Sequence, residues 1–541
     1  MKYLSLSLSA SLLLLGCQST TFPSAEEEAQ IVATEHLADP IEINQALLAD
    51  ESIAVIHPVA DVDIDLDNND IHISSDIWQH IRQNLSFDIP SNKRIDAQRN
   101  WYVKHPNYLD RVAKRAEPFM HYIVQELEAN DMPLEMTLLP IVESAFDPFA
   151  YSHGRASGMW QFVPGTGKRF GMKQNWWYDG RRDVAASTQG AVKYLKYLHK
   201  YFDGDWLLAL AAYNSGEGRV KRAMRNNARK NKPTDFWSLD LPKETRAYVP
   251  KLLALAEIVK QPEKFDLKLY EIENREVITK VDIKSQLDLA KAARLAELSL
   301  AEIQRLNPGF NRWATDPDGP HYLLLPTSKI EQFTTGLAKL SDKDRLSWQR
   351  YKIKNGDSLI KIANKFHTTP ELVAKVNNVK GTNIRAGKHL LIPVAAQALD
   401  DYILSQDKRL AKTQSRERSG VKLTHLVKNG DTLWDISRVY KVSTKSIAKW
   451  NGMAPRDYIK PGQKLVIWQK AKMTQSSASP VEQIVMRNIR YKVRRGDSFA
   501  RIADKFNVRI SDIEKWNSLS RKNYLQPGQM LKLSVDVTNS I

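Results

Sequence analysis

One nine-residue pattern occurs three times in the last third of the 541-residue chain, and it restricts the possible folds more than any other feature. The copies begin at Tyr351, His425 and Tyr491, and each has Gly-Asp at its sixth and seventh positions. An asparagine follows 26 residues after each start, at Asn377, Asn451 and Asn517. A second glycine follows the first by 31 or 32 residues. Spacing kept over three copies indicates a repeated structural unit.

Each unit reads as strand, helix, helix, strand. A Gly-Asp turn leads into a helix such as residues 360–366, a second helix ends at the asparagine, and a strand such as residues 390–393 closes the unit. The repeats resemble LysM modules, a resemblance that implies binding to glycans containing N-acetylglucosamine. Their expected bounds are 348–394, 423–468 and 489–534. The intervening Ser/Lys/Arg-rich segments, 395–422 and 469–488, are expected to be flexible linkers.

A fourth, degenerate unit precedes the three repeats. Residues 281–326 keep the 26-residue offset, from Val281 to Asn307, but Gln286 stands where the others have glycine. We expect this unit, within a connecting region at 265–345, to pack on the preceding domain instead of binding glycan.

The N-terminus has the features of an export signal. Lys2 precedes an apolar run from Tyr3 to Gly16, which is shorter than the roughly 20 residues needed to span a bilayer. Cys17 follows directly and is the only cysteine of the chain. The signal, residues 1–16, together with Cys17 resembles a bacterial lipoprotein box, although a chance cysteine after a simple signal is the alternative. With Gln18 next, that resemblance implies the Gram-negative outer membrane, facing the periplasm.

Charge is distributed unevenly along the chain. Residues 18–80 contain 14 Asp or Glu and no Lys or Arg, so residues 17–77 are expected to be a mostly disordered tether. Its alternating aspartates, from Asp61, do not fit a calcium loop, because Leu66 stands where glycine is required. Residues 348–541 contain 37 Lys or Arg and 15 Asp or Glu. This basic tail favours an anionic polymer as partner. A basic repeat that binds nucleic acid is the disfavoured alternative, and the expected export signal argues further against it.

Glu143 is an unusual carboxylate because residues 138–148 around it are almost wholly apolar. Burial disfavours the charged form and raises a carboxyl pKa, so Glu143 is a candidate proton donor. A solvated glutamate on the polar face of a helix is the alternative. Pro133 suits the first turn of this helix, Pro140 should weaken it, and Asp147-Pro148 should end it.

The glycine-rich stretch at residues 152–167 contains Met159, Trp160 and Gln161, which offer a soft wall, a stacking face and an amide. That composition suits a sugar groove, although a core turn with a packed tryptophan is the alternative. Tyr213 and Asn214 end a buried helix near residues 206–215. Tyr248 belongs to the last helix of this region, and either tyrosine could serve only packing.

Four elements stand in one order: Glu143-Ser144, residues 158–161, residues 212–216, and Glu244-Thr245 with Tyr248. Together they resemble the catalytic domain of the soluble lytic transglycosylase type, related to goose-type lysozyme. With the lipoprotein box and the repeats, the whole chain resembles the membrane-bound lytic murein transglycosylases. The implied fold is multidomain. A mainly α, lysozyme-like domain at 78–264, with its motifs in 115–260, precedes small α+β (βααβ) modules.

The resemblance also implies roles. Glu143 would be the sole acid and base, and the glycan would be bound by the residues matching Ser144, Met159, Gln161, Tyr213 and Asn214, with Tyr248 near the acid. Ser157 departs from the alanine common at its position. Asp147, the nearest other carboxylate, is interpreted as a turn residue. No metal, cofactor or protein partner is predicted. A hydrolytic muramidase and a non-catalytic wall-binding lipoprotein remain the alternatives.

Overall fold

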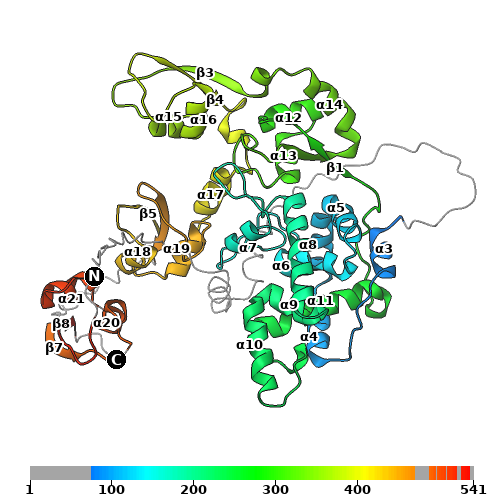
Figure 1. The fold of residues 1–541 in the computed structure, drawn as a ribbon, viewed down its shortest axis with the longest axis horizontal. Coiled ribbons are helices and arrows are strands. Elements are labelled where there is room, and N and C mark those ends of the chain that lie inside the picture. Colours follow the sequence, from blue (N-terminus) through cyan, green and yellow to red (C-terminus); the bar gives the residue numbers. More distant parts are fainter. Residues whose placement is uncertain (1–74, 470–485, 495, 507, 521–524, 537–541) are drawn as a thin grey trace, which may run out of the picture. The chain divides into compact units, whose positions relative to one another are not determined.

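The computed structural model describes residues 75–469, 486–494, 496–506, 508–520 and 525–536 (Figure 1). Residues 75–469 belong to one compact unit, and the last repeat, within residues 486–536, belongs to another. The expected signal peptide, Cys17, the tether up to residue 74 and residues 470–485 of the second linker lie outside the described residues. Among the helices of the described ranges, none has both the length and the apolarity to cross a membrane.

The first region is almost entirely helical, as its amphipathic spacing predicts. Its apolar core includes the stripe Phe119, Ile123, Val124 and Leu127 of α5, all of which are buried. The helices are α3 (Ile77–Gln83), α4 (Lys93–Val103), α5 (Pro106–Glu128), η1 (Leu134–Leu138), α6 (Leu139–Ser144), α7 (Pro164–Arg169), α8 (Val184–Tyr201), α9 (Trp206–Ser215), α10 (Glu217–Ala228), η2 (Phe236–Ser238), α11 (Lys243–Lys260) and η3 (Pro262–Phe265).

Aspartates start the two helices that follow the glycine-rich stretch. The Asp183 side chain accepts a hydrogen bond from the Ala186 amide (2.8 Å) at the start of α8, and Asp205 accepts one from the Leu208 amide (2.9 Å) at the start of α9. Such N-caps satisfy amides that have no partner within the helix. α9 packs against both α8 and α11 in the helical core (Figure 1). These contacts fix the ends of α9 and α11 that carry Tyr213 and Tyr248.

The segment that carries Glu143 is two short helices and not one. A 3₁₀ helix, η1, follows Pro133, and α6 then begins with Pro140 in its first turn, where a missing amide hydrogen costs nothing. The helix that was expected to be weakened at Pro140 is instead interrupted just before this residue, where η1 ends and α6 begins. α6 ends at Ser144, because Ala145 adopts a left-handed conformation (φ 52°). This is earlier than the Asp147-Pro148 pair that was expected to end the helix, and it leaves Glu143 in the last turn.

A small α/β unit follows, and we call it the LysM-like unit (residues 277–345). Its strands β1 (Ile278–Asp282) and β2 (Tyr322–Pro326) pair antiparallel, with Val281 opposite Leu323. Two helices lie between them in sequence, α12 (Leu289–Ala296) and α13 (Leu300–Leu306), and η4 (Thr327–Lys329), α14 (Ile330–Ala338) and η5 (Asp342–Arg345) follow. As expected, the unit packs on the helical region: Asn311 donates its amide to the Trp177 carbonyl (2.7 Å) and Asp179 donates its amide to the Gly309 carbonyl (2.8 Å).

The three repeats have the predicted order of strand, two helices and strand. Each repeat has a two-stranded antiparallel sheet (Figure 1). The elements are β3 (Ser347–Lys352), α15 (Leu359–Lys365), α16 (Pro370–Val376) and β4 (His389–Val394) in the first; β5 (Val421–Leu426), α18 (Leu433–Tyr440), α19 (Thr444–Trp450) and β6 (Lys464–Gln469) in the second; and β7 (Met486–Lys492), α20 (Phe499–Phe506), α21 (Ile510–Asn517) and β8 (Met530–Asp536) in the third.

The repeated asparagine has one structural role in every unit. Asn451 donates to the Ile447 carbonyl (2.7 Å) and the Val466 carbonyl (2.8 Å), and it accepts a hydrogen bond from the Val466 amide (2.7 Å). The side chain thus joins the end of the second helix to the closing strand. The corresponding bonds are present at Asn307, Asn377 and Asn517. The asparagine therefore makes the same joint in the LysM-like unit as in the three repeats.

The expectation of a flexible linker at 395–422 is wrong for most of that segment. It contains η6 (Leu399–Asp401) and α17 (Gln406–Ser415), and Tyr402 is only 1% exposed. The Tyr402 hydroxyl donates to Asp288 (2.9 Å) and the Arg312 guanidinium pairs with Asp407 (2.6 Å). The polar composition of the segment suggested flexibility. The hydrogen bond of the buried Tyr402 and the Arg312–Asp407 ion pair nevertheless attach it to the LysM-like unit.

Candidate active site

Glu143 lies in the last turn of α6 and its carboxyl group is surrounded by the helical core. Its neighbours in the chain Ile141, Ala145 and Phe146 are buried, whereas Glu143 itself is half-buried. Removal of water from the carboxyl group raises the pKa of Glu143 to about 8, and the charge of Glu244 adds to this, against a hydrogen bond from Tyr248 that lowers the pKa. A carboxyl group with that pKa is protonated at neutral pH and can donate a proton.

Tyr248 holds this carboxyl group in place. It projects from α11, is buried, and its hydroxyl donates to Glu143 Oε1 (2.6 Å). Burial, followed by the nearby Glu143 charge, raises the pKa of the Tyr248 phenol well above its usual value. The phenol therefore remains a hydrogen-bond donor throughout the range in which Glu143 titrates.

The predicted groove is bordered by residues 150–162, which we call the groove loop. Three consecutive carbonyls of this loop accept hydrogen bonds from predicted site residues: Gly158 from Gln161 Nε2 (2.7 Å), Met159 from Ser144 Oγ (2.9 Å) and Trp160 from the Tyr213 hydroxyl (2.8 Å). Ser144 belongs to α6 and Tyr213 to α9. Two helices of the core therefore fix the loop beside Glu143.

The predicted glycan-binding residues differ in exposure. Ser144 (2%) and Met159 (0%) have almost no exposed surface, so in this conformation they offer no face to a sugar and instead hold the loop. Gln161, Tyr213 and Asn214 remain partly exposed. The resemblance named these residues together as glycan-binding, but it did not tell which of them are covered in the fold.

Asn214 is oriented by a residue whose role the sequence did not reveal. Thr245, at the start of α11, donates its hydroxyl to Asn214 Oδ1 (2.8 Å). With its oxygen engaged, Asn214 has its amide group left as the donor for a further contact. Thr245 stands in the fourth motif, Glu244-Thr245 with Tyr248. Its place near the start of the helix that carries Tyr248 was the signal available in the sequence.

Asp147 is a turn residue, as interpreted from the sequence. Its Oδ1 accepts a hydrogen bond from the Phe149 amide (2.8 Å), which forms a local turn. Burial raises the pKa of Asp147, against the amide bond and nearby arginines, which lower it. The Asp147 carboxyl group thus has a structural partner of its own within the segment.

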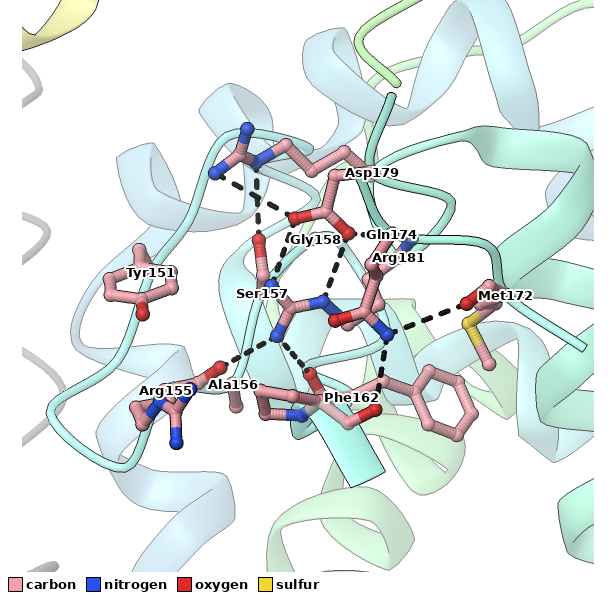
Figure 2. Close-up of polar contacts among 12 residues, drawn as sticks. Tyr151, Arg155, Ala156, Ser157, Gly158, Phe162, Met172, Gln174, Asp179 and Arg181 are labelled. Atoms are coloured by element: carbon pink, nitrogen blue, oxygen red, sulfur yellow. Dashed lines mark hydrogen bonds and ion pairs between the residues drawn. The ribbon is translucent and has the colours of Figure 1, made fainter. Parts of the chain in front are cut away.

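Ser157, the departure from the resembled pattern, is fully buried and its hydroxyl accepts a hydrogen bond from Arg182 Nε (3.1 Å). Figure 2 shows Ser157 in a polar cluster in which Arg181 lies between Asp179 and the loop residues Arg155 and Phe162. Sequence reasoning missed this cluster. Its signal was the charged run at residues 179–183, which is unusual directly between aromatic residues and a buried helix.

No group of three or more His, Cys, Asp or Glu side chains that could hold a metal occurs in the parts of the chain that the structure describes.

Comparison with known proteins agrees with this fold. The family described as "Transglycosylase SLT domain" matches residues 121–236, "Lytic transglycosylase MltD, LysM-like domain" matches residues 277–342, and "LysM domain" matches residues 351–393, 425–468 and 491–534. The fold and the site thus define a lytic transglycosylase with LysM repeats, of the lysozyme-like class.

The relatives narrow this class further. Membrane-bound lytic murein transglycosylase D of Escherichia coli (strain K12) is 34% identical over 472 residues, which cover 85% of this chain and 97% of that protein. The chain belongs to the membrane-bound lytic murein transglycosylase D family. N-acetylmuramoyl-L-alanine amidase sle1 of Staphylococcus saprophyticus is 30% identical over 201 residues, 37% of this chain and 56% of that protein.

Among solved structures, an inactive mutant of the lytic transglycosylase Slt from Pseudomonas aeruginosa is 25% identical and covers 35% of this chain and 32% of that chain, with a TM-score of 0.23.

Proposed function

We propose that this protein cleaves the β-1,4 bond between N-acetylmuramic acid and N-acetylglucosamine in peptidoglycan and leaves 1,6-anhydro ends. The observation that carries the proposal is the single protonated carboxyl group of Glu143, with its pKa raised to about 8 and its Oε1 fixed by Tyr248 at 2.6 Å. Most glycosidases use two carboxyl groups, one of which activates water or attacks the sugar. A site organised around one acid favours a reaction that needs neither.

In the first step, Glu143 donates its proton to the glycosidic oxygen. The bond between that oxygen and C1 of N-acetylmuramic acid breaks, and positive oxocarbenium character develops on the sugar ring. Tyr248 stabilises the carboxylate that forms, because its hydroxyl bonds to the charged oxygen. N-acetylglucosamine leaves with the proton as a free hydroxyl group.

In the second step, the ionised Glu143 acts as a base. It removes the proton of the 6-hydroxyl of the same N-acetylmuramic acid, whose oxygen forms a bond to C1 and closes the 1,6-anhydro ring. No water is consumed, and Glu143 ends protonated for the next cycle. Gln161, Tyr213 and Asn214, which keep exposed surface, are the groups available to bind the glycan. Ser144 and Met159 would act by holding the groove loop.

The LysM repeats would bind the same polymer. Several weak binding modules on one chain raise the local concentration of the catalytic domain at the glycan. The LysM-like unit, in contrast, is attached to the helical region by the Asn311 and Asp179 amides and is not expected to contribute to glycan binding.

We further propose that the protein is a lipoprotein of the Gram-negative outer membrane and faces the periplasm. The support is Cys17 after Leu15-Gly16 at the end of an apolar run, with Gln18 following. Metabolic labelling with a palmitate analogue tests this: the natural chain should be labelled and Cys17→Ala should not.

Digestion of purified sacculi, followed by mass spectrometry of the soluble products, tests the reaction. The expected products have anhydro ends, and Glu143→Gln should release none while still binding sacculi. Reducing ends would show a hydrolytic muramidase instead. Equal release by Glu143→Gln and the natural chain would remove the catalytic role of Glu143 and favour a non-catalytic wall anchor.

A further inference from the structure

Arg181 contacts two points of the groove loop that are distant along the loop. Its Nη1 donates to the carbonyl of Arg155 (2.7 Å) and to that of Phe162 (3.2 Å), and Figure 2 shows both bonds. Gly158, between these points, has φ +84°, and a Cβ built there would lie 1.8 Å from the Arg181 carbonyl oxygen. The loop therefore rests directly on the side chain and backbone of Arg181.

Asp179 fixes the arginine. Arg181 donates Nε to Asp179 Oδ1 (2.9 Å) and Nη2 to Asp179 Oδ2 (2.9 Å), a bidentate pair with both side chains at most 10% exposed. A planar guanidinium held at two points has one orientation, so its remaining nitrogen is aimed at the loop. Burial raises the pKa of Asp179, but Arg182 and Arg181 together hold it below its usual range. The pair therefore stays charged.

Arg182 makes a second connection, from the loop to a different domain. Its Nε donates to Ser157 Oγ (3.1 Å) in the groove loop, and its Nη1 donates to Asn311 Oδ1 (2.9 Å) in the LysM-like unit. Asn311 is itself 4% exposed and donates its amide to the Trp177 carbonyl (2.7 Å). The segment that carries Arg181 and Arg182 is thus bonded to the groove loop and also to the LysM-like unit.

We propose that Asp179, Arg181 and Arg182 are positioning residues, which hold the groove loop for glycan binding and make its position depend on the docked LysM-like unit. The substrate in this inference rests on the proposed function. The LysM-like unit then serves the active site as a support, through Asn311.

The first test is Arg181→Lys, measured in the full chain with soluble peptidoglycan strands as substrate and anhydro ends as product. Lysine keeps the charge beside Asp179 but cannot bond both carboxylate oxygens and both loop carbonyls. A displaced loop weakens glycan binding, so KM should rise, and kcat/KM should fall by about 10-fold or more, since a shift of about 1 Å can cost up to about 100-fold.

Arg99→Lys is the matched control. Arg99 also bonds two carboxylates, Asp96 (2.8 Å) and Glu257 (2.7 Å), but it joins α4 to α11. Loss of fold stability alone reduces the fraction of active enzyme, which lowers apparent kcat and leaves KM unchanged. Arg99→Lys should show that pattern at most, at a temperature well below both melting transitions.

The second test asks whether the LysM-like unit acts through Arg182. Asn311→Ala and Ser157→Ala should each raise KM, and the double variant should raise it by less than the product of the two single effects, because both act through Arg182. Gln304→Ala is the control, since Gln304 is 3% exposed in the same unit but accepts its bond from Leu404. It should leave KM unchanged.

The outcomes separate this inference from the proposed function. If the natural chain forms no anhydro ends, the proposed function fails, whatever the variants do. If the natural chain is active and KM is unchanged in Arg181→Lys and Asn311→Ala while their melting temperatures fall, these residues only stabilise the fold and the inference is overturned. Multiplicative effects of Ser157→Ala and Asn311→Ala would overturn the dependence on the LysM-like unit.

Discussion

Replacement of Glu143 by glutamine should stabilise the fold at alkaline pH while it abolishes cleavage. The amide keeps the shape of the side chain and can still accept the Tyr248 hydrogen bond, but it never becomes charged. In the natural chain, folding must place an ionised carboxylate in a desolvated site once the pH exceeds the pKa. Ionised Glu143 therefore lowers the free energy of unfolding of the natural chain.

The size of the effect follows from the shift. The pKa of Glu143 rises from 4.5 to about 8, and each unit corresponds to about 1.36 kcal/mol, so the full shift corresponds to about 5 kcal/mol. Glu143 is only half-buried, and screening by solvent lowers the expected cost to about 2 kcal/mol. For a domain of about 150–250 residues, such as the helical domain, a cost of about 2 kcal/mol corresponds to a difference in melting temperature of about 4–8 °C.

The sign is fixed by linkage. Below about pH 4.5, Glu143 is protonated in both the folded and the unfolded chain, and it costs nothing. Between about pH 4.5 and 8 the unfolded chain releases the proton and the folded chain keeps it, so the stability of the natural chain falls relative to the variant. Above about pH 8 the difference is complete.

Calorimetric melting of both proteins at pH 4.5 and pH 8.5 measures this difference. All other titrating groups are shared, so the change in the difference between the two proteins belongs to Glu143. Near-equal melting temperatures at pH 4.5 and a more stable variant at pH 8.5 are expected. A difference that is the same at both pH values would refute the raised pKa and, with it, the assignment of Glu143 as a proton donor at neutral pH.

Three further predictions follow from the site and the repeats. The rate should fall above about pH 8 as Glu143 loses its proton, and Tyr248→Phe, which removes the bond that lowers this pKa, should move the descending limb of the pH–rate profile to higher pH. Gly158→Ala should lower kcat/KM by at least 10-fold, because its Cβ would overlap the Arg181 carbonyl and the loop must shift; a KM and kcat equal to those of the natural chain would contradict this. Asn451→Ala leaves buried polar groups unpaired and should destabilise the second repeat by about 1–3 kcal/mol; unchanged sacculus binding and melting would argue against the joint.

The sequence was informative where one residue has a local role. Glu143 could be placed in the last turn of its helix because Asp147-Pro148 limits how far that helix can run, although it ends earlier, at Ser144. The asparagine offset identified the repeats, and Asn377, Asn451 and Asn517 each join a helix end to a strand. Such signals are local. The hydrogen-bond partners of each asparagine lie within about 15 residues of it, and proline restricts the backbone at its own position.

Contacts between distant segments were not predictable in this way. The sequence places Arg182 in a charged run. Nothing in that run indicates that Arg182 bonds Ser157 and Asn311, which lie 25 and 129 positions away in the chain. Tyr402 was likewise hidden in a polar segment, since its partner Asp288 lies 114 positions away. Pairings of this kind depend on how the domains meet, and single-sequence patterns carry no information on that.

The arrangement around Glu143 explains why so much buried polar structure surrounds a single reacting group. A carboxyl group with a raised pKa is useful only if the glycosidic oxygen lies within hydrogen-bonding distance of it. In this chain the loop beside Glu143 is built of turns and isolated bridges and not of helices or strands. Ser144 and Tyr213 bond the loop from the helical core, and Arg181 bonds it at Arg155 and Phe162. Each of these bonds restricts the loop backbone before substrate binds, so less binding energy is lost in ordering it. In the proposed mechanism one residue acts as both acid and base, which leaves little tolerance for misplacement. The buried Asp179–Arg181 ion pair restricts the loop where helices and strands do not.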